Sequence, residues 1–314
     1  MATASTRFLV LSDTHDFEFS DDPEEAEDIP LNAHQHLLPK ADVLLHCGDL
    51  TQVGGENSFK RCLKMLSRFE AELKLVIAGN HDLDLDKNHR LYKSHPDKDV
   101  VDKAALEDHA KAMEVMKGDL AKEAGVTYLE EGIHAFTLSN GTAFNIYASQ
   151  FTPNFWDWGF PYERDQDRFN TQAQAASDRT SIAINPIPSF PDVHIIMTHG
   201  PPHMILDQCH NGNAGCENLF RAASRARPLM HCFGHIHEGH AATLVTWTAE
   251  GGIAKPEKAS PNTTPQINSF PAADKWPIAF GEQTLMVNAA IMNARNNPEN
   301  APWLIDLELP LSKP

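Results

Sequence analysis

Five apolar runs in this chain end in the same way, and that recurrence limits its possible folds more than any other feature. Each run has the composition of a buried β-strand, and each stops at side chains that can bind a metal ion. Because side chains two apart on a strand share a face, such pairs can converge on one point. The runs and their ends are Phe8–Leu11 with Asp13 and His15, Ala41–Cys47 with Gly48 and Asp49, Leu73–Ala78 with Gly79, Asn80, His81 and Asp82, Val193–Thr198 with His199 and Gly200, and Leu229–Phe233 with Gly234, His235 and His237.

The segment between the second and third runs predicts a helix. Residues Asn57–Leu73 place apolar side chains at spacings of three and four, with Lys and Arg on the other side. The order strand, helix, strand is typical of a βαβ unit in a layered α/β protein. In such a sheet the carboxyl ends of neighbouring strands face one crevice, where we expect the polar run ends to meet.

A second sheet is expected from the middle of the chain. Residues Val126–Leu129, His134–Ser139 and Thr142–Ala148 read as antiparallel strands, and Asn140-Gly141 predicts a type I′ hairpin turn. Asp84–Lys98 is expected to be a loop, and Gly251–Pro277 to be an exposed insertion in a single domain spanning residues 1–314. Further helices are predicted at Asn32–Leu38, Asp99–Ala124 with Gly125 as its cap, Thr171–Ser181 and Glu217–Arg225, and further strands at Val245–Thr248, Thr284–Ile291 and Leu304–Leu309.

Composition narrows the classes of partner. The chain has 314 residues and a net charge of −17, which disfavours bulk binding to nucleic acid or to an anionic membrane. It contains neither an apolar run long enough to span a membrane nor a signal-peptide pattern at its start. Five cysteines without a paired framework favour a reduced, cytoplasmic protein. A zinc site at Cys209 and Cys216 is not favoured, because a second Cys/His pair at zinc-finger spacing is missing.

The side chains at the run ends favour transition metals. Imidazoles and carboxylates without thiolates suit Mn, Fe, Zn, Co or Ni, and Mn is the preferred choice. Two such ions about 3.5–4 Å apart can clamp a phosphoryl group and activate a bridging water. Asp49 is the natural bridge, because a carboxylate has two oxygens to share, whereas Asn80 can bind only through its carbonyl oxygen.

Taken together, these motifs resemble the calcineurin-like metallophosphoesterase superfamily, in the right order from Phe8 to His237. The resemblance implies a four-layer α/β/β/α sandwich with two metal ions. It also implies that His81 contacts the phosphoryl oxygen and protonates the leaving group. By the same resemblance one ion is bound by Asp13, His15, Asp49 and His237, and the other by Asp49, Asn80, His199 and His235.

Details of the motifs are similar to the MPPED-type branch of small metallophosphodiesterases. Gly48-Asp49-Leu50-Thr51, Phe233–Glu238 and Val287-Asn288-Ala289 carry this likeness. Ser/Thr protein phosphatases have an Asp and an Arg shortly after the Gly-Asp motif, where this chain has Gln52 and Val53. The departure disfavours protein phosphatase activity.

These expectations define a function with one alternative. The predicted enzyme hydrolyses a small phosphodiester or nucleotide-type substrate through a metal-bridging hydroxide, with His81 assisting the leaving oxygen. The alternative is a catalytically silent scaffold that keeps the metal-binding fold. The aromatic segment Ser149–Asp167 is either a loop over the core or a rim that stacks on substrate, with Phe155 and Trp156 as candidate contacts. Histidines inside the strands, at 46, 194 and 231, are expected to be structural or to orient ligands, and the sequence sets no oligomeric state.

Overall fold

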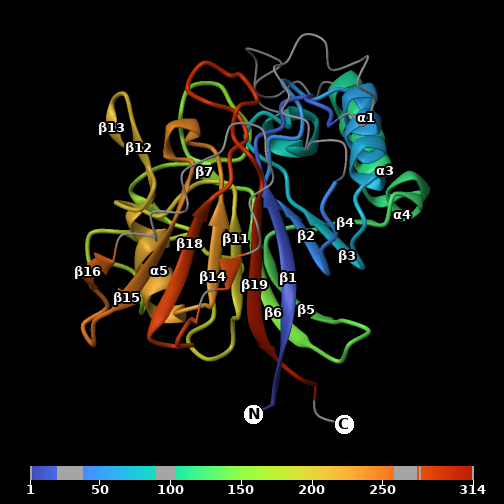
Figure 1. Ribbon diagram of the computed structural model, residues 1–314. Helices are drawn as coiled ribbons and strands as arrows, with labels where there is room; N and C mark the ends of the chain where they lie inside the picture. The colour runs from blue at the N-terminus through green and yellow to red at the C-terminus, as the bar shows by residue number, and fades with distance from the viewer. Residues whose placement is uncertain (1, 20–37, 90–102, 258–273, 276, 313–314) are drawn as a thin grey trace.

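Two β-sheets packed face to face form the centre of the molecule (Figure 1). The structure, a computed structural model, describes residues 2–19, 38–89, 103–257, 274–275 and 277–312. In the first sheet β1 to β4 are parallel to one another, and β19 runs antiparallel to β1. Its strands, in spatial order, are β17 (Asp274–Lys275), β19 (Trp303–Pro310), β1 (Thr3–Leu11), β2 (Val43–His46), β3 (Leu73–Val76) and β4 (Val126–Tyr128).

The second sheet has a parallel centre and antiparallel edges. Strands β6, β11, β14 and β18 are parallel, while β5 and β15 pair antiparallel with their neighbours. In spatial order the strands are β16 (Ile253–Glu257), β15 (Ala241–Trp247), β18 (Gln283–Asn288), β14 (Met230–Phe233), β11 (Ile195–Thr198), β6 (Ala143–Ser149) and β5 (Gly132–Thr137).

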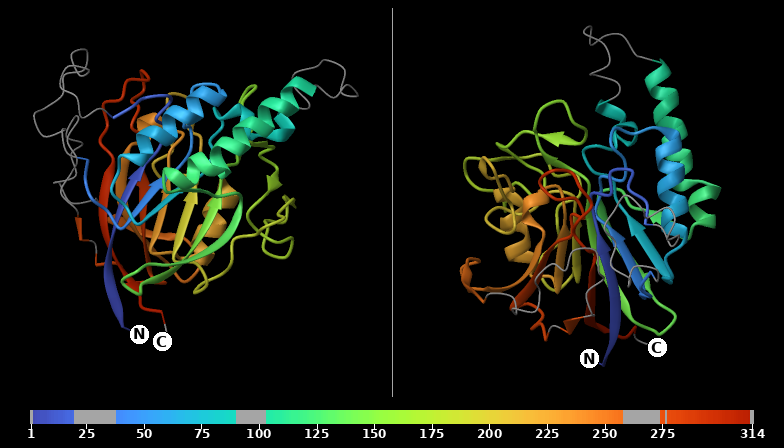
Figure 2. Two further views of the ribbon diagram at one scale, coloured as in Figure 1. Left: turned by 90° about the vertical axis from the view of Figure 1, so that its right-hand side faces the viewer. Right: turned by 45° about the horizontal axis from the view of Figure 1, so that its top comes forward.

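Helices cover the outer face of each sheet, as Figure 2 shows. The first sheet is covered by α1 (Glu56–Ser67), α3 (Lys103–Lys117) and α4 (Asp119–Glu123), and the second by α5 (Glu217–Ala226). The described residues form three apolar clusters, one between the sheets and one under each helical layer. The predicted four-layer α/β/β/α sandwich is therefore confirmed. None of the helices in the described ranges combines the length and apolar character that crossing a bilayer requires.

Short elements complete the structure outside the two sheets. Within the described ranges, three two-stranded ribbons and two 3₁₀ turns lie in the connections between the longer elements. They are β7 (Thr152–Pro153) with β8 (Pro161–Tyr162), β9 (Gln166–Asp167) with β10 (Thr180–Ser181), β12 (Gln208–Cys209) with β13 (Gly212–Asn213), η1 (Leu83–Leu85) and η2 (His237–Gly239).

The predicted helices differ from the observed ones in length and number. Helix α1 ends at Ser67, six residues before the predicted end, because the chain must turn to bring Leu73 onto β2. The long helix predicted to end at Ala124 is divided at Gly118, whose extended backbone separates α3 from α4. Residues 90–102, which include the predicted start of this helix, and most of the helix predicted at Asn32–Leu38 lie outside the described residues.

The helix predicted at Thr171–Ser181 is wrong. This segment forms turns and the short strand β10, and its glutamines bond to the backbone of the segment. The Gln174 side chain accepts from the Thr171 amide, and Gln172 accepts from the Ser181 amide. The Gln172 side chain therefore takes the Ser181 amide, which in the predicted helix would donate to a backbone carbonyl four residues earlier.

Two strand predictions also change. Val126–Tyr128 joins the first sheet as β4, parallel to β3, because helices α3 and α4 form a crossover that returns the chain to that sheet. The hairpin β5–β6 is confirmed, but of Asn140 and Gly141 only the glycine has a positive φ, so its turn is not type I′. The region predicted as an insertion carries strands at both ends, β16 and β17, and its residues 258–273 lie outside the description.

Candidate metal centre

The loops that follow the strands of both sheets meet at one end of the molecule. After β1 and β2, the Asp13 amide donates to the Gly48 carbonyl at 2.9 Å, and the His15 amide donates to the Asp49 carbonyl at 3.0 Å. The loops of the second sheet are tied to the first by the His235 amide, which donates to the Asp13 carboxylate at 3.0 Å. Figure 1 shows the arrowheads of β1, β14 and β18 pointing toward this end.

Four of the predicted ligands have a left-handed backbone. The φ angles are 57° for Asp13, 44° for His15, 54° for Asp49 and 65° for His235. This conformation is uncommon for residues other than glycine, and it turns the chain sharply at the strand end. Each of these side chains is thereby directed into the space between the loops instead of continuing along its strand.

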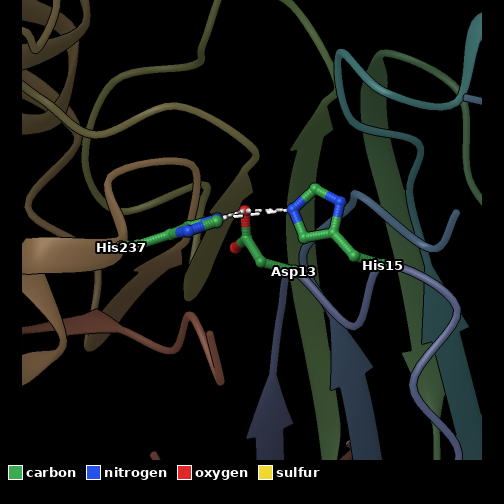
Figure 3. A group of neighbouring side chains, drawn as sticks. All are labelled: Asp13, His15 and His237. Carbon is green, nitrogen blue, oxygen red and sulfur yellow. Dashed lines mark hydrogen bonds and ion pairs between the residues drawn. The ribbon is translucent and has the colours of Figure 1, made fainter. Parts of the chain in front are cut away.

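Asp13, His15 and His237 form one group of possible ligands (Figure 3). His237 Nε2 lies 3.4 Å from Asp13 Oδ1, and His15 Nε2 lies 3.3 Å from His237 Nε2. Asp13 and His15 follow β1 of the first sheet, whereas His237 lies in the loop after β14 of the second. Residues separated by more than two hundred positions therefore converge on one point.

Asp49, His199 and His235 form a second group. His199 Nε2 lies 3.3 Å from Asp49 Oδ2 and 2.9 Å from the side-chain oxygen of Asn80. The other ring nitrogen of His199 lies 2.9 Å from the Cys47 carbonyl and donates to it. This bond fixes the tautomer that leaves Nε2 facing the Asp49 carboxylate.

Asp49 lies between the two groups. Its Oδ2 is 3.6 Å from His15 Nε2, and its Oδ1 accepts from the His81 amide at 2.8 Å. His81 also joins His15 and Asp49 in a third set of possible ligand atoms within 4.8 Å of one another. The structure thus brings together all seven residues predicted as ligands, and His81 lies beside two of them, His15 and Asp49.

The protonation of these groups follows from burial and from their contacts. Burial alone would raise the pKa of Asp13, but the hydrogen bond and charge of His237 lower it to about 2. Burial alone would lower the pKa of His199, but Asp49 raises it to about 9. Burial lowers the pKa of His15 although Asp49 opposes the shift. Burial alone would raise the pKa of Asp49, but His199 lowers it well below its usual range. Both carboxylates are therefore charged at neutral pH, and a bound cation can replace the histidine protons that balance this charge.

His81 has a backbone carbonyl as its hydrogen-bond partner. Its Nδ1 lies 2.7 Å from the carbonyl oxygen of Gln52, the residue that occupies the position of the phosphatase Asp. Trp158 stacks on the His81 ring, with centroids 3.7 Å apart. The candidate substrate contacts Phe155 and Trp156 instead stack on each other and are 51% and 79% exposed.

Two residues outside the predicted site hold its loops. Asp82 is fully buried and accepts hydrogen bonds from Gly79, Leu50 and Thr51. The Asn288 amide donates to the Ile236 carbonyl at 2.9 Å and so fixes the loop that carries His235 and His237. The sequence indicated both positions, since Asp82 is among the polar residues after the third run and Asn288 belongs to the Val287-Asn288-Ala289 motif, but it did not indicate these hydrogen bonds.

The histidines inside the strands have structural contacts, as expected. His46 Nε2 lies 3.0 Å from the Thr14 hydroxyl, and His231 Nε2 lies 2.9 Å from the Thr198 hydroxyl. The two threonines donate in turn to backbone carbonyls, so each histidine donates through Nε2. The predicted loop thiol Cys216 accepts from the Leu219 amide at the start of α5.

Known proteins resemble the chain over most of its length. Human metallophosphoesterase domain-containing protein 1 is 28% identical over 311 residues, which are 97% of this chain and 72% of that protein. Probable rhamnogalacturonate lyase C of Emericella nidulans is 31% identical over 212 residues, which are 67% of this chain but only 16% of that protein. The solved NAD nucleotidase of Haemophilus influenzae aligns with 92% of this chain and 45% of its own, at 13% identity and a TM-score of 0.40.

The sequence profile of the calcineurin-like phosphoesterases matches residues 6–239. This range contains every residue of the candidate metal centre. It also contains the parallel strands of both sheets, except the first residues of β1 and all of β18. Family membership accounts for the hydrolase class and for a requirement for metal ions. The chain belongs to the calcineurin-like phosphoesterase family.

Proposed function

We propose that the chain is a phosphodiesterase with two transition-metal ions, in which Asp13, His15, Asp49 and His237 bind one ion and Asp49, Asn80, His199 and His235 bind the other. The observation that carries this proposal is the central position of Asp49, whose Oδ2 lies 3.6 Å from His15 Nε2 and 3.3 Å from His199 Nε2. A carboxylate between two histidine groups from different sheets suits a bridging ligand.

The donor set supports metal ions at this place. Carboxylate oxygens, imidazole nitrogens and one amide oxygen fit Mn, Fe, Zn, Co or Ni, and we favour Mn. The Nδ1 atom of His15 is buried and has no hydrogen-bond partner, and its Nε2 faces Asp49 and His237. Such ions, when bound, supply positive charge to the phosphoryl group and increase the acidity of a water molecule.

The protein residues orient the reaction around this charge. Asp13 and Asp49 stay ionised and hold the histidines in place, and Cys47 fixes the His199 tautomer through its carbonyl. His81 donates through Nδ1 to Gln52, which leaves its Nε2 as the nitrogen that can deliver a proton. We assign to His81 the protonation of the leaving oxygen.

A diester is the favoured substrate. A phosphomonoester dianion carries more charge than a diester anion, and in Ser/Thr phosphatases an Arg near the Gly-Asp motif helps to neutralise it. Here Val53 occupies that position and is 57% exposed. We therefore expect small diesters or nucleotide-type substrates. Five free cysteines, four of them buried, support a reducing, cytoplasmic location for what we take to be a single domain.

The test compares two aryl substrates on protein loaded with Mn. The proposal predicts hydrolysis of bis(p-nitrophenyl) phosphate with a kcat/KM at least about 10-fold above that for p-nitrophenyl phosphate, and loss of both activities with EDTA. Turnover of the monoester alone would reject the diesterase assignment. If fully metallated protein hydrolyses neither substrate, the silent scaffold is the better account.

A further inference from the structure

The His81 ring is held on more than one side. Besides the 2.7 Å contact of its Nδ1 with Gln52, one face of the ring lies against the Trp158 indole at 3.7 Å with an angle of 24° between the planes. The His15 ring meets it edge-on, with centroids 4.6 Å apart. A single hydrogen bond to a carbonyl still lets an imidazole swing about that bond, whereas a flat contact fixes its plane.

The backbone around Trp158 is attached to the same part of the site. The Gly159 amide donates to the Asn80 carbonyl at 2.9 Å, and a Cβ atom at Gly159 would lie only 3.1 Å from that oxygen. On the other side, His89 Nε2 donates to the Asp157 carbonyl at 2.9 Å. The peptide groups flanking Trp158 are thus fixed to the chain on both sides of His81, so the stacking geometry is built into the loop.

We infer that Trp158 is the positioning residue that holds the His81 imidazole in the orientation needed to protonate the leaving group. This inference rests on the proposed function. In the reaction a hydroxide derived from water forms the new P–O bond, the bond from phosphorus to the leaving oxygen breaks, and the His81 proton goes to that oxygen. The proton released by the water returns to His81 through solvent. Trp158 touches neither the phosphorus nor the leaving oxygen and acts only through the ring.

If Trp158 positions His81, the effect of removing Trp158 on the rate should depend on how much the leaving group needs a proton. p-Nitrophenolate leaves without much help from an acid, whereas phenolate needs the proton, so a poorly oriented His81 slows the second far more than the first. A residue that only supports the loop would instead slow both substrates equally, through lost metal or lost stability. The ratio of rates for the two substrates therefore separates positioning from general support.

The experiment measures kcat for bis(p-nitrophenyl) phosphate and diphenyl phosphate with Mn-loaded protein. Trp158→Ala should lower kcat for diphenyl phosphate about 10-fold or more and change that for bis(p-nitrophenyl) phosphate by less than about 3-fold. Trp158→Phe, which keeps a flat ring, should recover most of the loss. Ile184→Ala removes an apolar side chain that is 81% exposed and lies outside the candidate metal centre, and it should leave both rates unchanged.

A double variant tests whether Trp158 acts through His81. In a His81→Ala background the further change Trp158→Ala should have no effect on either rate, because the ring that it positions is gone. Equal slowing of both substrates by Trp158→Ala, or a full further loss in the His81→Ala background, would overturn the inference. If the wild-type protein hydrolyses neither ester, the proposed function itself fails, and if it hydrolyses both with an unchanged ratio in Trp158→Ala, only the inference fails.

Discussion

Asp82 shows how one buried side chain organises the centre without belonging to it. Its two oxygens accept from the amides of Gly79, Leu50 and Thr51 and from the Thr51 hydroxyl, at 2.8 to 3.1 Å. Burial and the neighbouring Asp49 raise the pKa of Asp82 to about 7. The loop that carries Asp49 and the turn that carries Asn80 are thereby joined by a single carboxyl group.

Replacing this carboxyl should be costly. Asp82→Ala leaves several buried donors without an acceptor, so we expect the free energy of unfolding to fall by about 3 kcal/mol or more. Urea unfolding followed by circular dichroism measures this. Asp178→Ala, which removes a carboxylate that is 69% exposed, should change the value by less than about 0.5 kcal/mol. A similarly small change in Asp82→Ala would contradict its structural role.

Buried neutral histidines make stability depend on pH. Burial lowers the pKa of His231 to about 3, whereas an unfolded histidine titrates near pH 6.5. Below about pH 6.5 the unfolded chain gains a proton that the folded chain does not, so stability decreases as the pH falls, by about 1.4 kcal/mol per pH unit. His231→Gln should reduce the slope between about pH 6 and pH 4 by that amount, measured by urea unfolding. His210→Gln, at an exposed position, serves as control. An unchanged slope in His231→Gln would show that the buried His231 does not cause this pH dependence.

Each of the seven candidate ligands follows an apolar run, and this position is what distinguishes them in the sequence. What the sequence could not show is the left-handed backbone at Asp13, His15 and Asp49, since these angles depend on hydrogen bonds between loops far apart in the chain. The stacking of Trp158 on His81 could not be predicted either, because no local feature of the sequence distinguishes Trp158 from Trp156 in the same aromatic segment.

At the level of elements, the turn after β14 packs so closely against the turn after β1 that no space remains for a side chain at Gly234. A Cβ atom at Gly234 would lie 2.0 Å from Asp13 Oδ2 and 2.2 Å from the Ser12 hydroxyl. The absence of a side chain is therefore what lets the two sheets place Asp13 and His235 against each other.

Gly234→Ala should displace the Asp13 carboxylate and weaken metal binding about 10-fold or more, as changes beside metal ligands commonly do. Competition with a fluorescent Mn or Zn chelator measures the affinity. Gly252→Ala is the matched control, because its Cβ would meet its nearest neighbour, the Thr248 hydroxyl, at an ordinary 3.4 Å. Wild-type affinity in Gly234→Ala would show that the close approach does not matter for the centre.

Helices and strands with a strong local pattern of apolar residues could be predicted from the sequence. Segments whose structure depends on side-chain hydrogen bonds to the backbone, or on the path of the chain between sheets, could not. Helix α1 follows from its apolar spacing, although its end at Ser67 depends on how the chain returns to β3. The turns that replace the helix expected at Thr171–Ser181 depend on glutamine side chains that bond to the backbone. Assigning β4 to the first sheet required the path of the chain over α3 and α4, which no local pattern contains.

On the scale of the whole molecule, the centre exists only where the two sheets meet. Asp13, His15, Asp49 and Asn80 come from the first sheet, and His199, His235 and His237 from the second. The sheets share an apolar layer in which Phe8, Leu45 and Met197 are fully buried, and this layer sets their distance. The order of the four layers could be predicted from the family resemblance. The distance between the loops of the first sheet and those of the second could not be predicted.

We propose that the two sheets together bind two ions, and that the reaction requires both. The most direct measurement titrates metal-free protein with Mn and follows bound metal per chain alongside the rate of bis(p-nitrophenyl) phosphate hydrolysis. Bound metal should reach two ions per chain, and the rate should reach its maximum together with the second ion. Asp49→Ala should bind less than one ion at the same concentration and lose nearly all activity. Full activity with one ion per chain, or in the Asp49→Ala variant, would contradict this proposal.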